Sequence, residues 1–250
     1  YFSIGGSIRP RYEVLTNQQW DPDNDRSYYS QRIALHTDWH FGEHIRLFGE
    51  LQHGYVSQGY TFLQSDDLAV HQGFIEIKAR SPHFSYSLGR QEMKYGEGRL
   101  YDYGKGPNIR RTFDIGKITF SRYRTNIQVY YGKAVINNFG VFDNGFDLFK
   151  KNTPNQKVWG AHTQFQLLPN EGEDDNTEIY YLGLETGRAT FNDVTGKELR
   201  HTTGIRRYGR AGPRFTYNTE LIYQFGDLAD NTIDAFNIET DWQYCLIDKK

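Results

Sequence analysis

Cysteine, methionine and long apolar runs are scarce in this sequence of 250 residues. The single cysteine, Cys245, excludes an internal disulfide, and no Cys-X-X-Cys motif or Cys/His spacing of a metal site is present. No run of about 18 apolar residues occurs, so the sequence predicts no transmembrane helix. No signal peptide precedes the first strand-like segment, and we therefore expect a mature or trimmed chain.

Neither sign of charge dominates, and no catalytic motif stands out. The 29 basic and 31 acidic residues give a net charge of −2, which argues against nucleic acid as a partner. No Gly-X-Ser-X-Gly elbow occurs, so we do not expect an enzyme. His36 and His40 share one strand face but would lie about 13 Å apart, too far to share a metal ion. The acidic segment 21–25 lacks the glycine and glutamate of an EF-hand loop, and we expect neither a metal nor a cofactor.

Aromatic residues are abundant although the chain is polar on average. They make up 16% of the residues, with 19 Tyr and 17 Phe, while the mean hydropathy is −0.75. Disordered chains are poor in aromatic residues, so we expect a folded protein. A barrel that presents one face to lipid and the other to water fits this composition, and so does a soluble β-sandwich.

Alternating polar and apolar residues predict strands along the whole chain. We expect about twelve, at residues 4–15, 29–41, 44–54, 69–79, 84–93, 110–121, 126–134, 156–167, 177–186, 198–208, 214–225 and 232–244. Long connections alternate with short ones through the first seven strands. This order is typical of an all-β, antiparallel up-and-down barrel, whereas the Greek-key crossovers of a sandwich would not produce it.

The two faces of the expected strands differ in polarity. In segment 29–41, Leu35 and Trp39 alternate with His36 and Asp38. In a soluble sandwich the polar face is the outer surface, whereas in a membrane barrel it lines a water-filled lumen. The alternation therefore fits both folds, and strand length has to distinguish them.

Strand length and strand ends favour a transmembrane β-barrel. Most expected strands reach the roughly 9–11 residues that a spanning strand needs, and aromatic residues at 39–41 and 223–225 lie near strand ends, as in interfacial belts. Two features are irregular. Arg90 shares a face with Leu88, which indicates a position at the exterior rim or a bulge that shifts the register. Segment 179–185 is hydrophobic on both faces and stays unassigned.

Residues 88–100, with the sequence LGRQEMKYGEGRL, resemble the alginate-export family of outer-membrane porins. Members carry a Gly-Arg-Gln-Glu segment that ends a strand, followed by a glycine and an Arg-Leu pair. The next strand usually opens with Arg and Phe-Asp-Gly, and here residues 110–116 read RRTFDIG, with Ile115 inserted before the glycine. An opening strand at 5–13 and the segment 217–226 also fit, so short motifs cover nearly the whole chain.

The resemblance implies an 18-stranded monomeric barrel in the outer membrane of a Gram-negative bacterium. The best-known member exports the polyanion alginate through an arginine-rich pore. This chain departs from the family in length, and no closing strand with a terminal aromatic follows Cys245. We therefore expect residues 1–250 to form a single outer-membrane β-barrel domain that is the N-terminal portion of a longer barrel, with a smaller barrel as the alternative.

The alternation also predicts which charged side chains line the lumen. The basic residues expected to line the pore and bind solute are Arg9, Arg11, Arg32, Arg46, Lys78, Arg90, Lys117, Arg200, Arg206 and Arg214. The acidic residues expected in the lumen are Glu13, Asp38, Glu50, Glu76, Glu220, Glu239 and Asp241. Arginine pairs bidentately with carboxylate, which suits an acidic sugar, whereas cross-strand Arg–Glu pairs that only stiffen the wall are the alternative.

We predict an outer-membrane channel for passive export or diffusion of a polar or anionic solute, such as an acidic polysaccharide like alginate. The expected partners are that solute, outer-membrane lipid and periplasmic export partners, and the barrel is expected to be a monomer. The loop 135–156, which carries Lys150 and Lys151, either folds inward to constrict the pore or stays solvated outside. The alternative is a soluble or surface-exposed β-sheet protein for binding or adhesion, without a pore.

Overall fold

The computed structural model describes residues 1–57, 65–81, 83–104, 106–146, 156–166 and 175–246. Within them lie twelve strands and one short 3-10 helix, η1 (Gln18–Trp20). The strands are β1 (Phe2–Leu15), β2 (Arg26–Phe41), β3 (Ile45–Val56), β4 (Asp66–Lys78), β5 (Phe84–Gln91), β6 (Phe113–Arg122), β7 (Thr125–Ala134), β8 (Lys157–Phe165), β9 (Asp175–Phe191), β10 (Val194–Ala211), β11 (Phe215–Leu228) and β12 (Asn231–Tyr244). The expected number of strands is confirmed, and each expected segment overlaps an observed strand. Across the described residues, no helix has the length and apolar character needed to cross a membrane.

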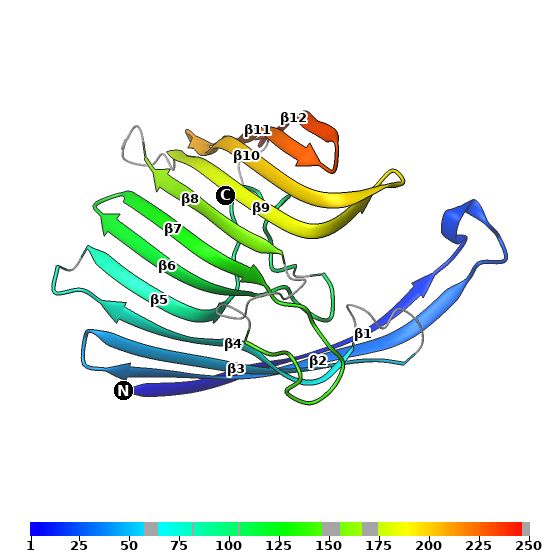
Figure 1. The fold of residues 1–250 in the computed structure, drawn as a ribbon, viewed down its shortest axis with the longest axis horizontal. Coiled ribbons are helices and arrows are strands. Elements are labelled where there is room, and N and C mark those ends of the chain that lie inside the picture. The colour runs from blue at the N-terminus through cyan, green and yellow to red at the C-terminus, as the bar shows by residue number, and fades with distance from the viewer. Residues whose placement is uncertain (58–64, 82, 105, 147–155, 167–174, 247–250) are drawn as a thin grey trace.

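All twelve strands belong to one antiparallel sheet, and each strand pairs with the next along the chain. The predicted up-and-down order is therefore confirmed (Figure 1). The sheet curves along its width but does not close, and β1 and β12 are its two edges. Strand lengths run from 8 residues in β5 to 18 residues in β10, so most strands are long enough to cross a membrane.

The two rims of the sheet carry different connections. The turn rim holds short connections, at 42–44, 79–83, 123–124 and 212–214 among others. The loop rim, opposite, holds the long connections that follow β1, β5 and β7 (Figure 1). The expected alternation of long and short connections ends after β8. There Asn192 and Asp193, at positive φ of 44° and 66°, join β9 to β10 by a tight turn on the loop rim.

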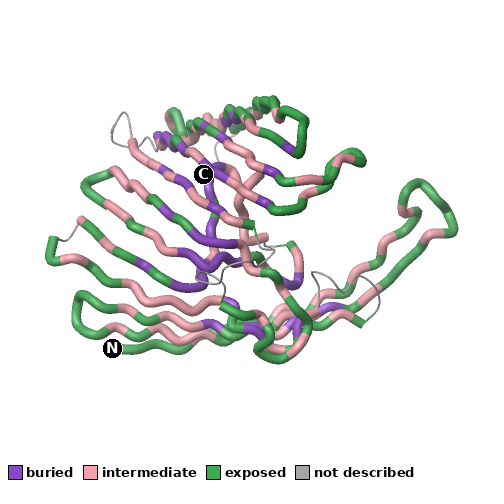
Figure 2. Tube along the Cα trace, viewed as in Figure 1, coloured by how far each residue is buried: buried purple, intermediate pink, exposed green. Residues whose placement is uncertain are grey.

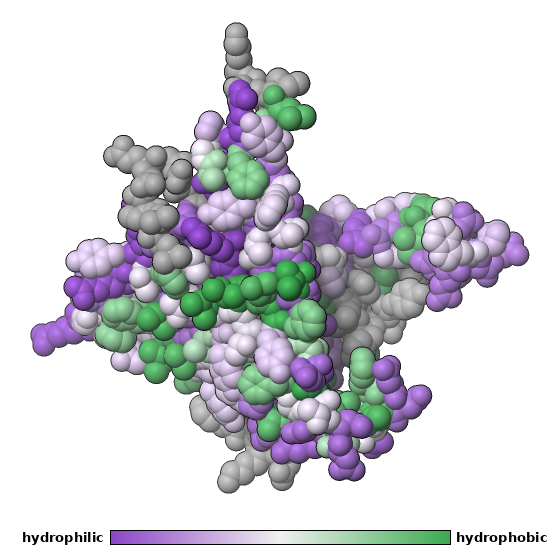
Figure 3. Space-filling model, turned by 90° about the horizontal axis from the view of Figure 1, so that it is seen from above, coloured by the Kyte–Doolittle hydropathy of each residue, from purple (hydrophilic) through white to green (hydrophobic). Residues whose placement is uncertain are grey.

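The two faces of the sheet differ in polarity. We call the face that the β5–β6 connection covers the inner face, and the opposite face the outer face. Ile33, Leu35 and Trp39 of β2 are exposed on the outer face, whereas Arg32 of the same strand reaches across the inner face to Pro107. Figure 3 shows hydrophobic side chains gathered in a band with hydrophilic residues beside it. An apolar surface of this extent is characteristic of contact with lipid or with another protein.

Candidate functional site

The connection between β5 and β6 crosses the inner face instead of extending into solvent. We call this connection, residues 92–112, the inward segment. It contacts β1–β3 near one edge of the sheet and β9–β12 near the other. In Figure 1 the teal trace runs behind β8 and β9, and Figure 2 shows the buried residues concentrated in the middle of the sheet. A long loop was predicted at 94–108, but its inward course was not.

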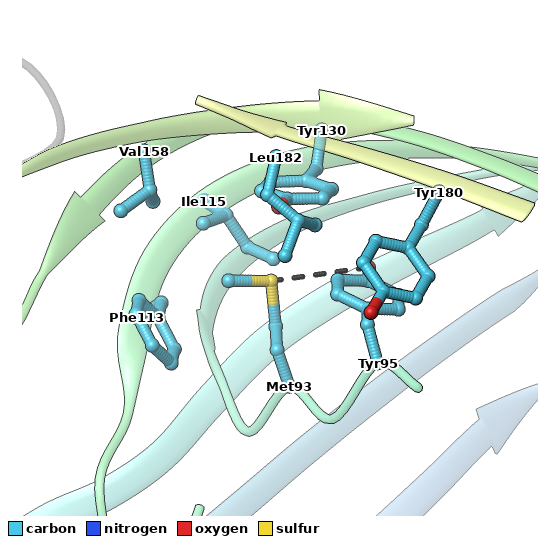
Figure 4. Packing of buried hydrophobic residues seen from close by; sticks show 8 residues of the cluster. All are labelled: Met93, Tyr95, Phe113, Ile115, Tyr130, Val158, Tyr180 and Leu182. Atoms are coloured by element: carbon cyan, nitrogen blue, oxygen red, sulfur yellow. Dashed lines mark hydrogen bonds between the residues drawn. The ribbon is translucent and has the colours of Figure 1, made fainter. Parts of the chain in front are cut away.

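Apolar packing holds the first part of the inward segment. The buried cluster consists of Met93, Tyr95, Phe113, Ile115, Tyr130, Val158, Tyr180 and Leu182 (Figure 4). Tyr95 stacks on Tyr130 with ring centroids 5.3 Å apart, and Ile115 is 0% exposed. Full burial of one such side chain contributes about 1.5–3 kcal/mol. The cluster therefore fixes the segment on β6–β9.

The two-sided hydrophobicity of residues 179–185 has a structural reason. Tyr180 and Leu182 point into the cluster and are each 4% exposed, whereas Ile179 is exposed on the outer face. β9 is thus apolar on the inner face only where the inward segment packs against it. Apolar residues on the lumen side of one strand, together with Met93 and Tyr95 in a loop, were the sequence signal for this packing.

Tyrosine hydroxyls of the inward segment bond to the wall. Tyr95 donates to Gln128 Oε1 at 3.2 Å, and Tyr101 donates to the Gly183 carbonyl at 3.3 Å. Burial raises the pKa of both Tyr95 and Tyr101. Both hydroxyls therefore stay protonated and keep acting as donors.

The two ends of the inward segment meet in a group of ion pairs that we call the base. Glu92 accepts from His71 Nε2 at 2.8 Å and pairs with Arg110 Nη1 at 2.8 Å. Arg110 also pairs with Glu50, which is 8% exposed. Buried ions persist only where partners satisfy them, since an unpaired buried charge costs several kcal/mol. The base therefore fixes the points where the segment leaves and rejoins the wall.

The bend of the inward segment, residues 96–99, is the tip, and it reaches β9–β12. The backbone N–H groups of Gly96 and Glu97 donate to the carboxylates of Glu178, at 3.1 Å, and Glu220, at 3.3 Å. The Glu97 carboxylate pairs with Arg206. Both wall carboxylates are buried, at 6% and 4% exposed. They hold the tip by accepting backbone N–H bonds rather than by pairing only with cations.

Further contacts of the tip are more exposed. Asn218 donates to Glu97 at 2.8 Å, and Arg99 pairs with Glu239. The side chains of Arg99 and Glu239 are 33% and 42% exposed. Such pairs contribute only about 0–1 kcal/mol each because water screens them.

Near its other end the inward segment lies against arginines of β1 and β2. Arg9 donates to the carbonyls of both Gly106 and Pro107, Arg11 donates to that of Gly106 and Arg32 to that of Pro107, at 3.0–3.4 Å. Three predicted pore-lining residues thus come together around two backbone oxygens. Arg11 also pairs with Glu13.

Asn108 anchors the same end of the inward segment. Its side-chain amide donates to the carbonyls of Gln31, at 2.7 Å, and Tyr55, at 3.1 Å. These two residues are paired across β2 and β3, so the amide bonds to both strands of one ladder.

A polar hollow of about 430 Å³ lies on the inner face toward the turn rim. Its lining brings together the predicted residues Arg46, Lys78 and Lys117. Arg46 is neutralised, since it bonds bidentately to Asp38 at 2.8 Å and pairs with Glu76 at 3.6 Å. Within the described part of the chain, neither lysine forms an ion pair. The hollow therefore holds two cationic side chains that an anion can reach.

The remaining basic residues predicted in β10 and its following turn take different places. Arg206 reaches the tip, and Arg200 pairs with Glu198 at 2.6 Å on the inner face. Arg214 is exposed in the turn 212–214 at the turn rim, and it does not lie on the inner face of a strand. Several predicted lumen residues are thus paired to each other, as the wall-stiffening alternative expects.

Arg90 does not line the inner face, contrary to the prediction. β5 pairs with both neighbours without a register shift, so Arg90 stays on the outer side with Leu88, at the loop rim. There it is 4% exposed and bonds bidentately to Asp114 at 2.8 and 3.1 Å. Its other N–H groups donate to the Asn144 and Gly145 carbonyls at 3.1 and 2.7 Å. Asn144 and Gly145 belong to the connection after β7. This connection covers the ion pair on the outer side, so the pair is buried with its partners instead of facing lipid.

The connection after β7 lies along the edge of β4 rather than across the inner face in residues 135–146. Asp67 N–H donates to the Phe139 carbonyl at 3.0 Å, and Phe142 N–H donates to the Leu68 carbonyl at 2.8 Å. β5 pairs with β4 only from Gly73 onward, so these bonds occupy backbone groups that β5 leaves free. Lys150 and Lys151 lie outside the described residues.

Comparison with known proteins identifies similar sequences and folds. The family model described as "Alginate export" matches residues 1–250. A loop-deletion mutant of OmpT, an outer-membrane protein of Vibrio cholerae, superposes with a TM-score of 0.55 at 13% identity, covering 100% of this chain and 77% of that one. A triple mutant of the Rhodopseudomonas blastica porin gives a TM-score of 0.41 at 12% identity, with coverages of 99% and 91%. Among curated proteins, none matches. At such identities the OmpT likeness shows the fold alone.

Proposed function

Because this chain belongs to the alginate-export family, we propose that it is a passive outer-membrane channel for an anionic solute, such as an acidic polysaccharide. A channel role fits the family and the porin-like sheet. The observation that carries the choice of an anion is the polar hollow on the inner face, where Lys78 and Lys117 form no ion pair within the described residues and Glu76, which shares the lining, is paired with Arg46. The proposal includes a Gram-negative outer membrane, a monomer, periplasmic export partners and no catalysis.

The chemistry of the hollow suits a single carboxylate at a time. Ammonium groups are compact point charges that bind anions without a fixed geometry. Arg46 is already held by Asp38 and Glu76, so a passing anion meets the lysines first. Conduction requires sites that attract the solute yet release it, and the exposed Lys78 and half-buried Lys117 meet this requirement better than arginines fixed by carboxylates.

The inward segment directs the solute to one side of the lumen. Between the tip and β9–β12 the inner face is occupied by ion pairs, in which Arg206 and Arg99 neutralise the buried carboxylates of Glu178 and Glu220. Unlike Arg9, Arg11 and Arg32, the lysines of the hollow on β4 and β6 make no bond to the inward segment within the described residues. We infer that an anion follows the β3–β6 wall past the hollow.

Block of single-channel current by oligo-uronates tests this proposal. Wild-type protein in a planar bilayer is expected to show transient block by a uronate oligomer, and little block by a neutral oligosaccharide of equal length. The double variant Lys78→Gln/Lys117→Gln is expected to need about thirty times more uronate, since each lysine near a surface contributes about 1 kcal/mol. The matched control is Lys197→Gln, which removes an exposed lysine of β10 outside the hollow. Equal block by uronate and neutral sugar would overturn the assignment of an anion.

A further inference from the structure

The polar hollow is a trough along β5, because this strand carries small residues on the inner face where its neighbours carry large ones. Ser85, Ser87 and Gly89 of β5 lie between the inner-face residues of β4 and β6 in the register. Ser85 is paired with Lys78 of β4, and Ser87 is paired with Lys117 of β6. β4 and β6 thus form the two walls of the trough. Its volume of about 430 Å³ is on the scale of pockets that hold one small molecule.

One wall of the trough contains an aromatic ring, although its inner-face neighbours along the strand are polar. Phe74 of β4 lines the hollow and is paired with Phe48 of β3 on one side and with Gly89 of β5 on the other. Phe48 covers one face of Phe74, since the two rings stack with centroids 5.3 Å apart. Gly89 has no side chain, so its position in β5 leaves the opposite face of Phe74 uncovered.

Arg46 does not cover this second face of Phe74. Its guanidinium carbon lies 5.4 Å from the ring centroid of Phe48 and 5.5 Å from that of Phe74. Because these distances are nearly equal, the guanidinium lies beside the gap between the two stacked rings. On the far face of Phe74 it would be much farther from Phe48 than from Phe74. The face of Phe74 that is turned toward β5 is therefore open to a solute in the trough.

The trough also contains a buried hydrogen-bond donor that lacks an acceptor. Gln91 of β5 lines the hollow and is 4% exposed. Its Oε1 accepts from Ser87 Oγ at 3.1 Å, whereas its Nε2 has no hydrogen-bond partner among the described residues. A buried N–H group without an acceptor is unfavourable, so a solute oxygen that reaches Nε2 gains a bond that the protein leaves unmade.

We propose that Phe74 is a stacking platform for a pyranose ring and that the trough holds one sugar residue of a passing acidic polymer, an inference that rests on the proposed anion channel. The C–H groups of a pyranose face pack on the electron-rich face of an aromatic ring. Lys78 and Lys117 attract the carboxylate of the same residue, and Gln91 Nε2 donates to one of its oxygens. Ammonium groups are point charges without a fixed geometry, so the lysines attract any anion and Phe74 adds the preference for a sugar.

Single-channel block by two polymers with the same number of carboxylates tests the platform. An oligo-uronate has pyranose faces, whereas an oligoglutamate has none, and wild-type protein is expected to hold the uronate longer in each blocking event. Phe74→Leu keeps an apolar side chain but removes the flat face. It is expected to shorten uronate block about fivefold and to leave glutamate block unchanged. Phe74→Tyr keeps the ring and should retain the wild-type blocking times.

Phe120→Leu is the matched control, because it removes a ring on the outer face of β6. It should change neither blocking time, and heat-modifiable migration on gels checks that each variant is folded. Equal blocking times for the two polymers in the wild type, or equal shortening of both in Phe74→Leu, would overturn the platform.

The platform and the channel proposal fail separately in this assay. Lys78→Gln/Lys117→Gln is expected to weaken block by both polymers alike, and unchanged block in this variant would contradict the channel proposal. A difference between the polymers that Phe74→Leu leaves intact would contradict the platform alone. Absence of block by either polymer in the wild type would overturn both.

Discussion

The inward segment is attached to its wall in two different ways. At the base, Arg110 and His71 lie between Glu50 and Glu92, in a buried group next to the apolar cluster. At the tip, the buried carboxylates of Glu178 and Glu220 accept backbone N–H bonds from residues 96–97, and an exposed pair joins Arg99 to Glu239. Buried carboxylates thus fix the segment at both ends, but the tip also includes an exposed pair that water and salt can weaken. We expect the buried contacts to determine whether the segment folds inward and the exposed pair only the final position of the tip.

Removal of the base cation should give the largest effect. Arg110→Gln leaves Glu50 and Glu92 close together without their shared partner, and loss of one member of a buried pair costs about 3–5 kcal/mol. The inward segment should then become accessible to trypsin at Lys94 and Arg99, and single-channel conductance should rise. Arg188→Gln, which removes an exposed arginine of β9, is the control. Unchanged proteolysis and conductance in Arg110→Gln would show that the apolar cluster alone holds the segment.

The addition of a methyl group to a glycine beneath the apolar cluster should have an intermediate effect on stability. A Cβ at Gly204 of β10 would overlap the ring of Tyr180, which lies over this glycine. Gly204→Ala is therefore expected to destabilise the barrel by about 1–3 kcal/mol in urea unfolding from lipid. Gly187→Ala is the matched control, since a Cβ there meets nothing within 4 Å. Equal unfolding midpoints for the two variants would argue against close packing at Tyr180.

Loss of the exposed tip pair should have the smallest effect. Glu239→Gln removes the exposed partner of Arg99 and leaves Arg99 beside the buried Glu220, so it is expected to raise hydrogen exchange at the Gly96 and Glu97 amides less than about fivefold. Salt at about 1 M, where the Debye length is about 3 Å, should remove most of the difference from wild type. An effect as large as that of Arg110→Gln would reverse the order of the two attachments.

Much of the fold followed from the sequence, because a period of two leaves a clear pattern in long strands. The twelve strands, their antiparallel order and the family were all predicted. Strand ends were less exact: β10 runs to Ala211, and the turn at Asn192–Asp193 was not anticipated. Two polar residues within a longer polar stretch do not show that the strands on either side continue up to them and form a tight turn.

The candidate site was predicted only in part. The alternation of polar and apolar residues along the strands correctly placed Arg32, Arg46 and Lys117 on the inner face. It carries no information about which connection folds over them. The connection 135–156 was the one considered for a constriction. Its residues 135–146 lie along β4, and residues 92–104 and 106–112 run over the inner face. Apolar residues in a loop, Met93 and Tyr95, bury themselves against β9, and this long-range packing is not visible in local periodicity. The burial of Arg90 could not be predicted for the same reason, because Asn144 and Gly145, which cover it, lie 54 and 55 residues away in the sequence.

The reversal potential of the full-length protein in a potassium chloride gradient tests the central claim most directly. If the β3–β6 wall offers its lysines to passing ions, chloride should be favoured over potassium, and the double variant Lys78→Gln/Lys117→Gln should move the potential toward zero. A potassium preference in the wild type, or a potential that the variant leaves unchanged, would contradict the account.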